Sequence, residues 1–275
     1  MKRAALINDL CGFGKTSLVV SIPILTVMGI DCSPMPTAIL SSHTGYSEFF
    51  FDDYTEKMDA YQKKWQALNV KFDMIYSGFL GSEKQIHIIS DMADAFSSPL
   101  LIDPVMGDNG KIYVTYTEKM CNDMKHLCEK ADIITPNLTE ACLLSGAKYM
   151  GEDISDEYAK EIINRLSDKL KNVGHIVITG IKRDNRAYNA VFDNGSVSFT
   201  ENRLCGRYFD GTGDVFASIV CGATLCGHGF YDSVRAAADF IEKSAFYSKE
   251  MNADRKDGII LSEYICELGK LRYEK

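Results

Sequence analysis

The sequence predicts an α/β protein with a mostly parallel sheet covered by helices on both faces, and three observations carry this prediction. Short, continuous apolar runs such as 4–7 and 100–102 recur along the chain. Segments with helical spacing of apolar residues separate them. Continuous apolar strands are typical of parallel sheets that are buried on both faces. Finally, Asp193-Asn194-Gly195 between two apolar-rich runs predicts one added antiparallel hairpin.

The elements follow in order from the changing periodicity of apolar residues. The first strand, 4–7, is followed by a glycine-bearing loop at 10–14 and by helical spacing over 16–28, which ends at Gly29. Further strands are expected at 35–40, 74–76, 100–102, 132–134 and 175–179, with hairpin strands at 186–192 and 197–200. Further helices are expected at 54–68, 84–96, 117–130, 139–145, 156–170 and 215–226. No linker or fixed-period repeat interrupts this alternation, so we expect a single domain over residues 1–275.

Composition narrows the class of protein. The chain has 275 residues, 46% hydrophobic and 25% charged, which is average for a globular protein. A net charge of -8 without a dense basic cluster argues against general nucleic-acid binding. The longest apolar run, 18–30, is too short to span a bilayer and lacks a signal-peptide cleavage pattern, so we expect no membrane association. The nine scattered cysteines form no metal-binding motif and fit the reducing cytoplasm.

Polar residues gather where the predicted strands end. They are Asn8 and Asp9, residues 41–44, residues 77–78, Asp103, Asn137, and residues 179–180. In open parallel sheets, ligands bind in the crevice beyond the carboxyl ends of the strands. Because six such clusters fall on one predicted edge, we expect the functional site there.

The strongest local motif is Gly211-Thr212-Gly213-Asp214 at a predicted helix start. Glycines leave backbone N–H groups free to point one way, and the helix N-terminus favours negative charge. This arrangement suits a phosphate during transfer, and Asp214 is placed to take the proton of an attacking hydroxyl. A helix cap is the structural alternative, because Asp and Thr favour that position.

Two other segments carry groups suited to metal and nucleotide. Asp103-Pro104-Val105-Met106-Gly107-Asp108 directly follows a buried strand, and its carboxylates can coordinate Mg²⁺. In Thr135-Pro136-Asn137-Leu138-Thr139-Glu140, the last residue and Asn137 are three apart and share one face of a new helix. They can present an amide and a carboxylate to a hydrated metal, or form a helix cap.

The loop after the first strand resembles a phosphate-binding motif but does not match it. Gly14-Lys15-Thr16 resembles the end of a phosphate-binding P-loop, but that motif requires glycine at position 9, where this chain has Asp. Asp9 is instead placed to hydrogen-bond a ring substituent of a substrate. His43, after the second strand, is expected to be structural more often than catalytic.

Taken together and in order, these segments resemble the ribokinase-like superfamily, specifically its vitamin-kinase branch and the pyridoxal kinase family within it. The likeness spans nearly the whole chain and rests on residues 77–82, residues 103–108 with Gly110 and Tyr113, residues 134–137 with Glu140, and residues 211–214. The resemblance implies a three-layer α/β/α sandwich that transfers the γ-phosphoryl group of ATP to a primary alcohol on pyridoxal, pyridoxamine or pyridoxine.

The resemblance also implies roles for particular residues. Asp214 would be the base, with Gly211, Thr212 and Gly213 as the anion hole. Nucleotide and Mg²⁺ would be bound by Asp103, Asp108, Thr135, Asn137, Glu140 and Thr179, with Asp103 and Glu140 nearest the metal. Substrate contacts would fall at Asp9, Thr44 and Gly45. Family members are typically homodimers, so a homodimer is expected.

Three alternatives remain open from the sequence. Asp9-Leu10-Cys11-Gly12 also resembles the corresponding loop of hydroxymethylpyrimidine kinases, which act in thiamine biosynthesis. A sugar kinase fits less well, because the chain lacks the early insertion common in that branch. A non-catalytic relative that keeps the fold and binds a vitamin or nucleotide is the third.

Overall fold

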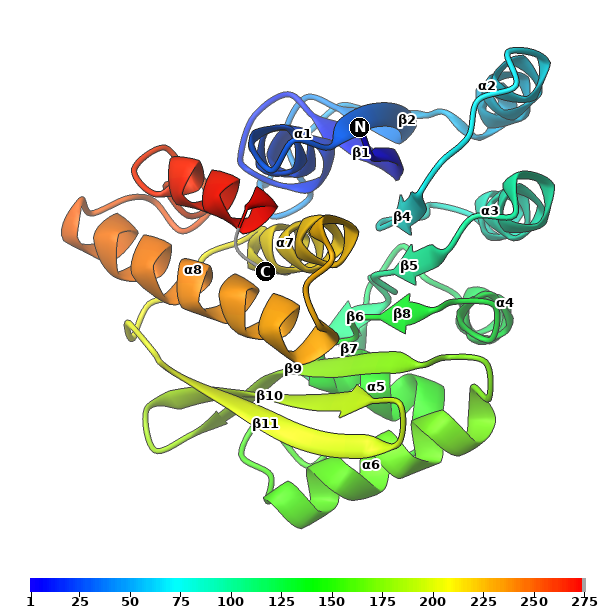
Figure 1. The fold of residues 1–275 in the computed structure, drawn as a ribbon. Coiled ribbons are helices and arrows are strands. Elements are labelled where there is room, and N and C mark those ends of the chain that lie inside the picture. Colours follow the sequence, from blue (N-terminus) through cyan, green and yellow to red (C-terminus); the bar gives the residue numbers. More distant parts are fainter. Residues whose placement is uncertain (274–275) are drawn as a thin grey trace.

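Short apolar segments lie side by side in a nine-stranded sheet at the centre of the computed structural model, which describes residues 1–273 (Figure 1). Its strand order is β11-β10-β9-β8-β5-β4-β1-β2-β3. The strands are β1 (Arg3–Cys11), β2 (Asp31–Leu40), β3 (Phe51–Asp53), β4 (Met74–Ser77), β5 (Leu100–Ile102), β8 (Ile133–Ile134), β9 (His175–Arg183), β10 (Arg186–Asp193) and β11 (Ser196–Arg203). The pairs from β2 to β9 are parallel, whereas β3, β10 and β11 are antiparallel to their neighbours.

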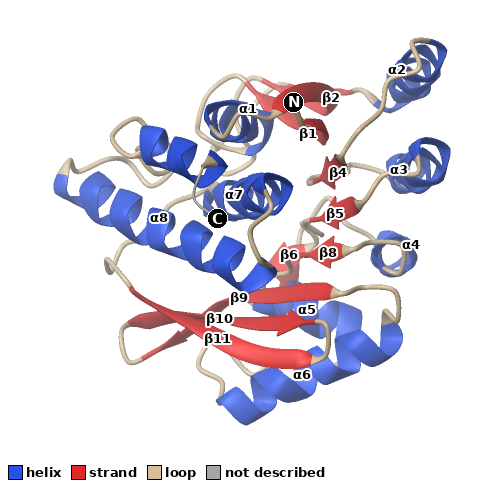
Figure 2. Cartoon of the chain, in the orientation of Figure 1, coloured by secondary structure: helices blue, strands red, loops and turns tan. Residues whose placement is uncertain are grey.

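Helices cover both faces of this sheet, as the separate helix layers in Figures 1 and 2 show. One face carries α2 (Thr55–Ala67), α3 (Glu83–Phe96), α4 (Glu118–Cys128), α5 (Leu138–Ser145) and α6 (Asp156–Lys169). The other carries α1 (Ser17–Val27), α7 (Thr212–Cys226), α8 (Phe230–Glu250) and the 3₁₀ helix η1 (Ile265–Arg272). A separate hydrophobic cluster fills the space on each side, with Ile86 and Ile162 in one and Leu18 and Val220 in the other.

The predicted fold class is therefore confirmed. The Asn194-Gly195 turn closes the β10–β11 hairpin with positive φ at both residues, +46° and +96°, which is the geometry that a two-residue hairpin loop requires. Five elements were not predicted. They are the short edge strand β3, the two-stranded hairpin of β6 (Gly107–Asp108) and β7 (Lys111–Ile112), and the helices α8 and η1.

Two further observations bear on the environment of the protein. All nine cysteines are free thiols, and six of them are buried, so they act as small packing residues as expected. Within residues 1–273, no helix is long and apolar enough to cross a membrane.

Candidate active site

The register of the parallel strands brings the predicted polar clusters to one edge of the sheet. Ile7 pairs with Ser77, Ser77 with Ile102, and Ile102 with Ile134, so these four residues form one row across the sheet. The residues that follow them in the chain, including Asn8 and Asp103, therefore project from the same edge. The structure therefore brings the polar residues predicted from the sequence together at this edge.

Asp214 lies in the first turn of α7 and faces this edge. Nδ2 of Asn8 donates a hydrogen bond to Oδ1 of Asp214 over 3.1 Å. Burial raises the pKa of the Asp214 carboxyl to about 6. The backbone of Ser17 and the Asn8 amide lower this pKa, whereas the charge of Asp9 raises it. The result is a carboxylate that can exchange a proton near neutral pH.

Gly211 precedes α7 in a position that admits no side chain. Its φ is +77°, and a Cβ on it would lie 2.1 Å from the carbonyl oxygen of Lys15. Gly213 is exposed, and a Cβ there would lie 3.9 Å from Oδ2 of Asp103. The start of α7 is thus packed against the loop after β1 on one side and opens towards Asp103 on the other.

Asp9 lies behind Asp214, almost fully buried. Its Oδ1 accepts a hydrogen bond from Oγ of Ser17 at 2.5 Å, and its Oδ2 accepts one from Sγ of Cys11 at 3.0 Å. Burial raises the pKa of the Asp9 carboxyl. Both carboxylate oxygens therefore already have partners within the protein.

Asp103 supplies a third carboxylate to the edge. It is 8% exposed, and its side chain makes no hydrogen bond within residues 1–273. Burial raises the pKa of Asp103 well above its usual range, and the negative charges of Glu140 and Asp214 add to this. A buried carboxylate without a partner, next to two others, is a favourable place for a cation.

Glu140 and Asn137 form a capping box at the start of α5, which is the structural alternative that the sequence left open. The Asn137 side chain accepts from the Glu140 N–H, and Oε2 of Glu140 accepts from the Asn137 N–H at 2.9 Å. Oε1 of Glu140 accepts from the N–H of Met106 at 2.9 Å. The Asn137 amide also donates to the carbonyl of Gly107 at 2.8 Å, so both side chains hold the 103–108 loop in place.

The remaining predicted nucleotide residues lie along the same edge. Asp108 accepts hydrogen bonds from the backbone and side chain of Asn109, and Thr179 forms an isolated parallel bridge with Asn137. Thr135 is buried, and its Oγ1 has no hydrogen-bond partner in the described structure. An unpartnered buried hydroxyl at a ligand crevice has a donor and an acceptor to offer a ligand.

Comparison with known proteins now identifies the family. Residues 27–259 match the phosphomethylpyrimidine kinase family. This chain belongs to that family. A Bacteroides thetaiotaomicron protein provisionally assigned as a phosphomethylpyrimidine kinase, whose crystal structure contains pyridoxal, is 36% identical, with a TM-score of 0.91 over 97% of this chain and 95% of the other.

Two more relatives point to the same group of kinases. The crystal structure of pyridoxal kinase from Lactobacillus plantarum is 28% identical, with a TM-score of 0.91 over 98% of this chain and 96% of that chain. A Staphylococcus aureus protein provisionally named a pyridoxine kinase is 29% identical and covers 71% of each chain. The predicted membership of the ribokinase-like superfamily is confirmed, and the chain is a vitamin kinase of this ATP-using family.

The carboxylates fit part of the metal site predicted for such a kinase. Asp103 is free to bind a cation, whereas both oxygens of Glu140 are already engaged by backbone N–H groups. In the described part of the chain, no three His, Cys, Asp or Glu side chains enclose a metal on their own. This suits Mg²⁺, which commonly takes one or two carboxylates and completes its shell with phosphate oxygens and water. Glu140 would then act on the metal at longer range.

Sequence reasoning missed a set of contacts that join the loops of this kinase. Nδ1 of His43 accepts from the N–H of Gly45 at 3.1 Å, so the proton is on Nε2, which donates to the carbonyl of Lys256 at 2.7 Å. Tyr46 donates from its hydroxyl to Oδ1 of Asp257 at 2.7 Å. Both ring nitrogens of His43 are engaged by the backbone, which agrees with the structural role that the sequence favours for it. It anchors the exposed loop that carries the predicted substrate residues 44 and 45 to the C-terminal loop.

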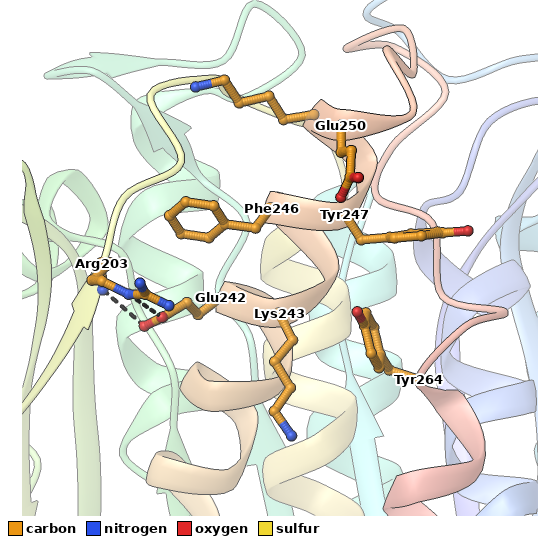
Figure 3. Close-up of a pocket in the computed structure, with 8 residues that line it drawn as sticks. Arg203, Glu242, Lys243, Phe246, Tyr247, Glu250 and Tyr264 are labelled. Carbon is orange, nitrogen blue, oxygen red and sulfur yellow. Dashed lines mark hydrogen bonds and ion pairs between the residues drawn. The ribbon is translucent and has the colours of Figure 1, made fainter.

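A separate hollow of about 500 Å³ lies beside α8 and contains none of the predicted site residues (Figure 3). Its cationic side chains are already partnered. Arg203 pairs with Glu242 at 2.7 Å, and Lys243 pairs with Glu267 at 2.8 Å. Lys249 also lines the hollow and donates to the carbonyl oxygen of Cys205 at 2.6 Å. The candidate catalytic residues lie elsewhere, at the edge of the sheet.

Proposed function

We propose that this kinase transfers the γ-phosphoryl group of ATP to the hydroxymethyl group of pyridoxal, pyridoxamine or pyridoxine. The observation that carries this proposal is Asp214, a partly buried carboxylate whose pKa is raised to about 6 at the start of α7. The pyridoxal in the related Bacteroides structure supports the choice of acceptor.

In the proposed reaction, Asp214 acts as the general base. The acceptor hydroxyl oxygen forms a bond to the γ-phosphorus while the bond from that phosphorus to the β,γ-bridging oxygen breaks and ADP leaves. The hydroxyl proton passes to the Asp214 carboxylate. The free N–H groups at Gly211, Thr212 and Gly213 stabilise the charge on the transferred group, because the helix start holds them in place before the reaction.

The other residues bind and orient the two substrates. Asp103 would hold Mg²⁺, which neutralises phosphate charge when bound. Asp108, Thr135, Asn137 and Thr179 would place the nucleotide along the edge of the sheet. Thr44 and Gly45, in the exposed loop after β2, would contact the vitamin ring, and Asp9 lies beneath that site.

An activity panel tests this proposal directly. ADP formation would be measured with ATP and each of pyridoxal, pyridoxamine, pyridoxine and hydroxymethylpyrimidine. We expect the highest kcat/KM for a B6 vitamer. No ADP formation with any acceptor would instead support the non-catalytic binding protein.

A second function, hydroxymethylpyrimidine kinase, is favoured by the family match and by the Asp9-Leu10-Cys11-Gly12 loop. The same panel distinguishes it, because both acceptors carry a primary alcohol on an aromatic ring, but the B6 vitamers are pyridines and hydroxymethylpyrimidine is a pyrimidine. A kcat/KM at least tenfold higher for hydroxymethylpyrimidine would replace the B6 assignment.

We also propose a cytoplasmic homodimer. The free thiols fit a reducing compartment. The exposed aromatic residues Phe49, Phe50 and Phe51, which lead into the edge strand β3, form an apolar surface suited to a second copy of the chain. Sedimentation of the parent and of Phe50→Ser tests this. A parent that sediments as a monomer at micromolar concentration would contradict it.

A further inference from the structure

Ser17, the first residue of α1, holds an unusual backbone conformation next to the proposed base. Its φ is +55°, in the left-handed region that non-glycine residues seldom occupy. Ser17 is 5% exposed, and the preceding Thr16 provides no side-chain cap to the helix. Such strain persists only where surrounding contacts impose it, and it concentrates at functional sites.

The contacts that impose it run to two carboxylates. Oγ of Ser17 donates to Oδ1 of Asp9 at 2.5 Å in a buried hydrogen bond. The backbone of Ser17 also lies near the Asp214 carboxylate and lowers the pKa of that group. Ser17 therefore contacts the buried Asp9 carboxylate through its hydroxyl and lies next to the Asp214 carboxylate that we propose as the base.

A buried line of hydroxyl groups fixes the same geometry from the other side. Oγ of Ser21 donates to the carbonyl of Ser17 at 2.9 Å. Oγ of Ser218 lies 2.9 Å from Oγ of Ser21 and 2.6 Å from the carbonyl of Asp214. Ser21 and Ser218 are fully buried, and this line of direct contacts connects the first turn of α1 to the first turn of α7.

We propose that Ser17 is a positioning residue for phosphoryl transfer. Its hydroxyl, bound to Asp9, holds Ser17 itself, at the start of α1, in the left-handed conformation that directs the Ser17 N–H at Asp214. Asp9 then acts through Ser17 rather than by touching the vitamin ring. This inference rests on the proposed function, and it assigns to Asp9 a role different from the substrate contact predicted from the sequence.

The variant Ser17→Gly separates this role from stability. Glycine adopts positive φ without strain but lacks the hydroxyl. We expect kcat to fall about tenfold while the KM values for ATP and pyridoxal stay within twofold, because the base is misaligned and both substrate sites are intact. The Tm should change little, because the relief of left-handed strain offsets the loss of the buried hydrogen bond to Asp9. A kcat within twofold of the parent's, or a change confined to KM, would overturn the inference.

Ser97→Gly is the matched control. Ser97 has a similar φ of +48° but is exposed at the end of α3, before the opposite edge of the sheet. We expect an unchanged kcat and an unchanged or higher Tm for this variant. A fall in kcat equal to that of Ser17→Gly would show that relieving left-handed strain anywhere in the protein impairs it, and the specific role of Ser17 would be lost.

A double-mutant cycle tests the link to Asp9. Asp9→Ala alone should lower kcat, and adding Ser17→Gly should lower it by less than threefold more, because both changes remove the same hydrogen bond. Multiplicative effects, or a changed ranking of pyridoxal against hydroxymethylpyrimidine in Asp9→Ala, would contradict action through Ser17. A parent without turnover on any acceptor would remove the proposed function and this inference together. A normal parent with a fully active Ser17→Gly removes the inference alone.

Discussion

The side-chain amide of Asn8 donates to Oδ1 of Asp214 across a separation of 206 positions in the chain. The direction of this bond follows from the other contacts of Asn8, because its Oδ1 accepts from the N–H groups of Phe79 and Asp9. Only Nδ2 is left to face Asp214. Gly78 makes room for it, since a Cβ there would lie 2.3 Å from that nitrogen. Asn8, near the end of β1, thus holds the proposed base at the start of α7.

Asp214→Asn is expected to reduce kcat by about 10²–10⁴-fold, which is the usual contribution of a general base. Asparagine has nearly the same size and keeps its place in the first turn of α7, but it cannot accept the hydroxyl proton. Residual turnover above background is expected, because the N–H groups of the anion hole remain. The measurement is kcat together with ATP binding and Tm.

Asp232→Asn serves as the control for this substitution. Asp232 lies in the first turn of α8, is exposed, and belongs to no predicted site. It should retain parental kcat. A kcat of Asp214→Asn within about threefold of the parent's would mean that Asp214 is not the base.

The pH dependence of activity follows from the raised pKa of Asp214. A base must be deprotonated before it accepts a proton, so kcat/KM should rise with pH through about pH 6 and level off above it. The measurement is kcat/KM between pH 5 and 8 at saturating Mg²⁺ and ATP. An acidic limb with a midpoint near the ordinary aspartate value of about 4 would contradict a partly buried base.

The raised pKa of Asp214 lowers the stability of the fold over the same pH range in which activity increases. The folded state binds the Asp214 proton more tightly than the unfolded state does, so this carboxyl destabilises the fold as pH rises through about 6. Asp214→Asn removes the ionisation. We therefore expect its Tm to exceed the parent's at pH 8, and the difference to shrink as pH falls to 5. A Tm difference that grows towards low pH would contradict the raised pKa.

Much of the fold could be predicted from the sequence because apolar periodicity and turn chemistry are local signals. The 100–102 run and the Asn194-Gly195 turn each determine their own structure. The edge strand β3 was missed because its three residues are exposed and show no alternation, so only its pairing with β2 makes it a strand. The β6–β7 hairpin has two residues in each strand, too few for any periodic signal.

The candidate site also has features that the sequence predicts and features that it does not. The edge of the sheet could be predicted, because polar residues follow each buried strand. The partners of these residues could not, because they come from distant segments. Asn8 was noted at the end of the first strand, but nothing local pairs it with Asp214. The left-handed φ of Ser17 has no sequence signal, since serine is rarely found there. The sequence around Glu140 is compatible with both a helix cap and a metal ligand. Only the structure shows that both of its carboxylate oxygens accept hydrogen bonds from backbone N–H groups.

Glu140→Gln is expected to lower the Tm by several degrees. Both oxygens of Glu140 accept from backbone N–H groups, of Met106 and Asn137, and a glutamine side chain would turn its NH₂ towards one of them. A buried N–H without an acceptor costs about 1–3 kcal/mol. Because the 103–108 loop shifts with this cap, the KM for ATP and the Mg²⁺ requirement should also rise.

Glu118→Gln, at the exposed start of α4, is the control and should change none of these three quantities. An unchanged Tm would show that the cap contributes little to stability, and unchanged ATP and Mg²⁺ parameters would limit Glu140 to the cap.

Gly211→Ala is expected to impair both catalysis and stability, because two constraints act on this residue at once. An L-residue at φ +77° is strained by about 1 kcal/mol. In addition, the new Cβ would lie 2.1 Å from the carbonyl oxygen of Lys15, so the chain must move away from the loop after β1.

Gly227→Ala separates the two effects, since Gly227 ends the same helix at φ +94° with nothing within 4 Å of a Cβ. Gly227→Ala should lower the Tm slightly and keep parental kcat. Gly211→Ala should lower the Tm further and reduce kcat by at least tenfold, because displaced N–H groups no longer face the transferred phosphoryl group. Equal kcat for the two alanine variants would show that the close approach of Gly211 to Lys15 has no part in the anion hole.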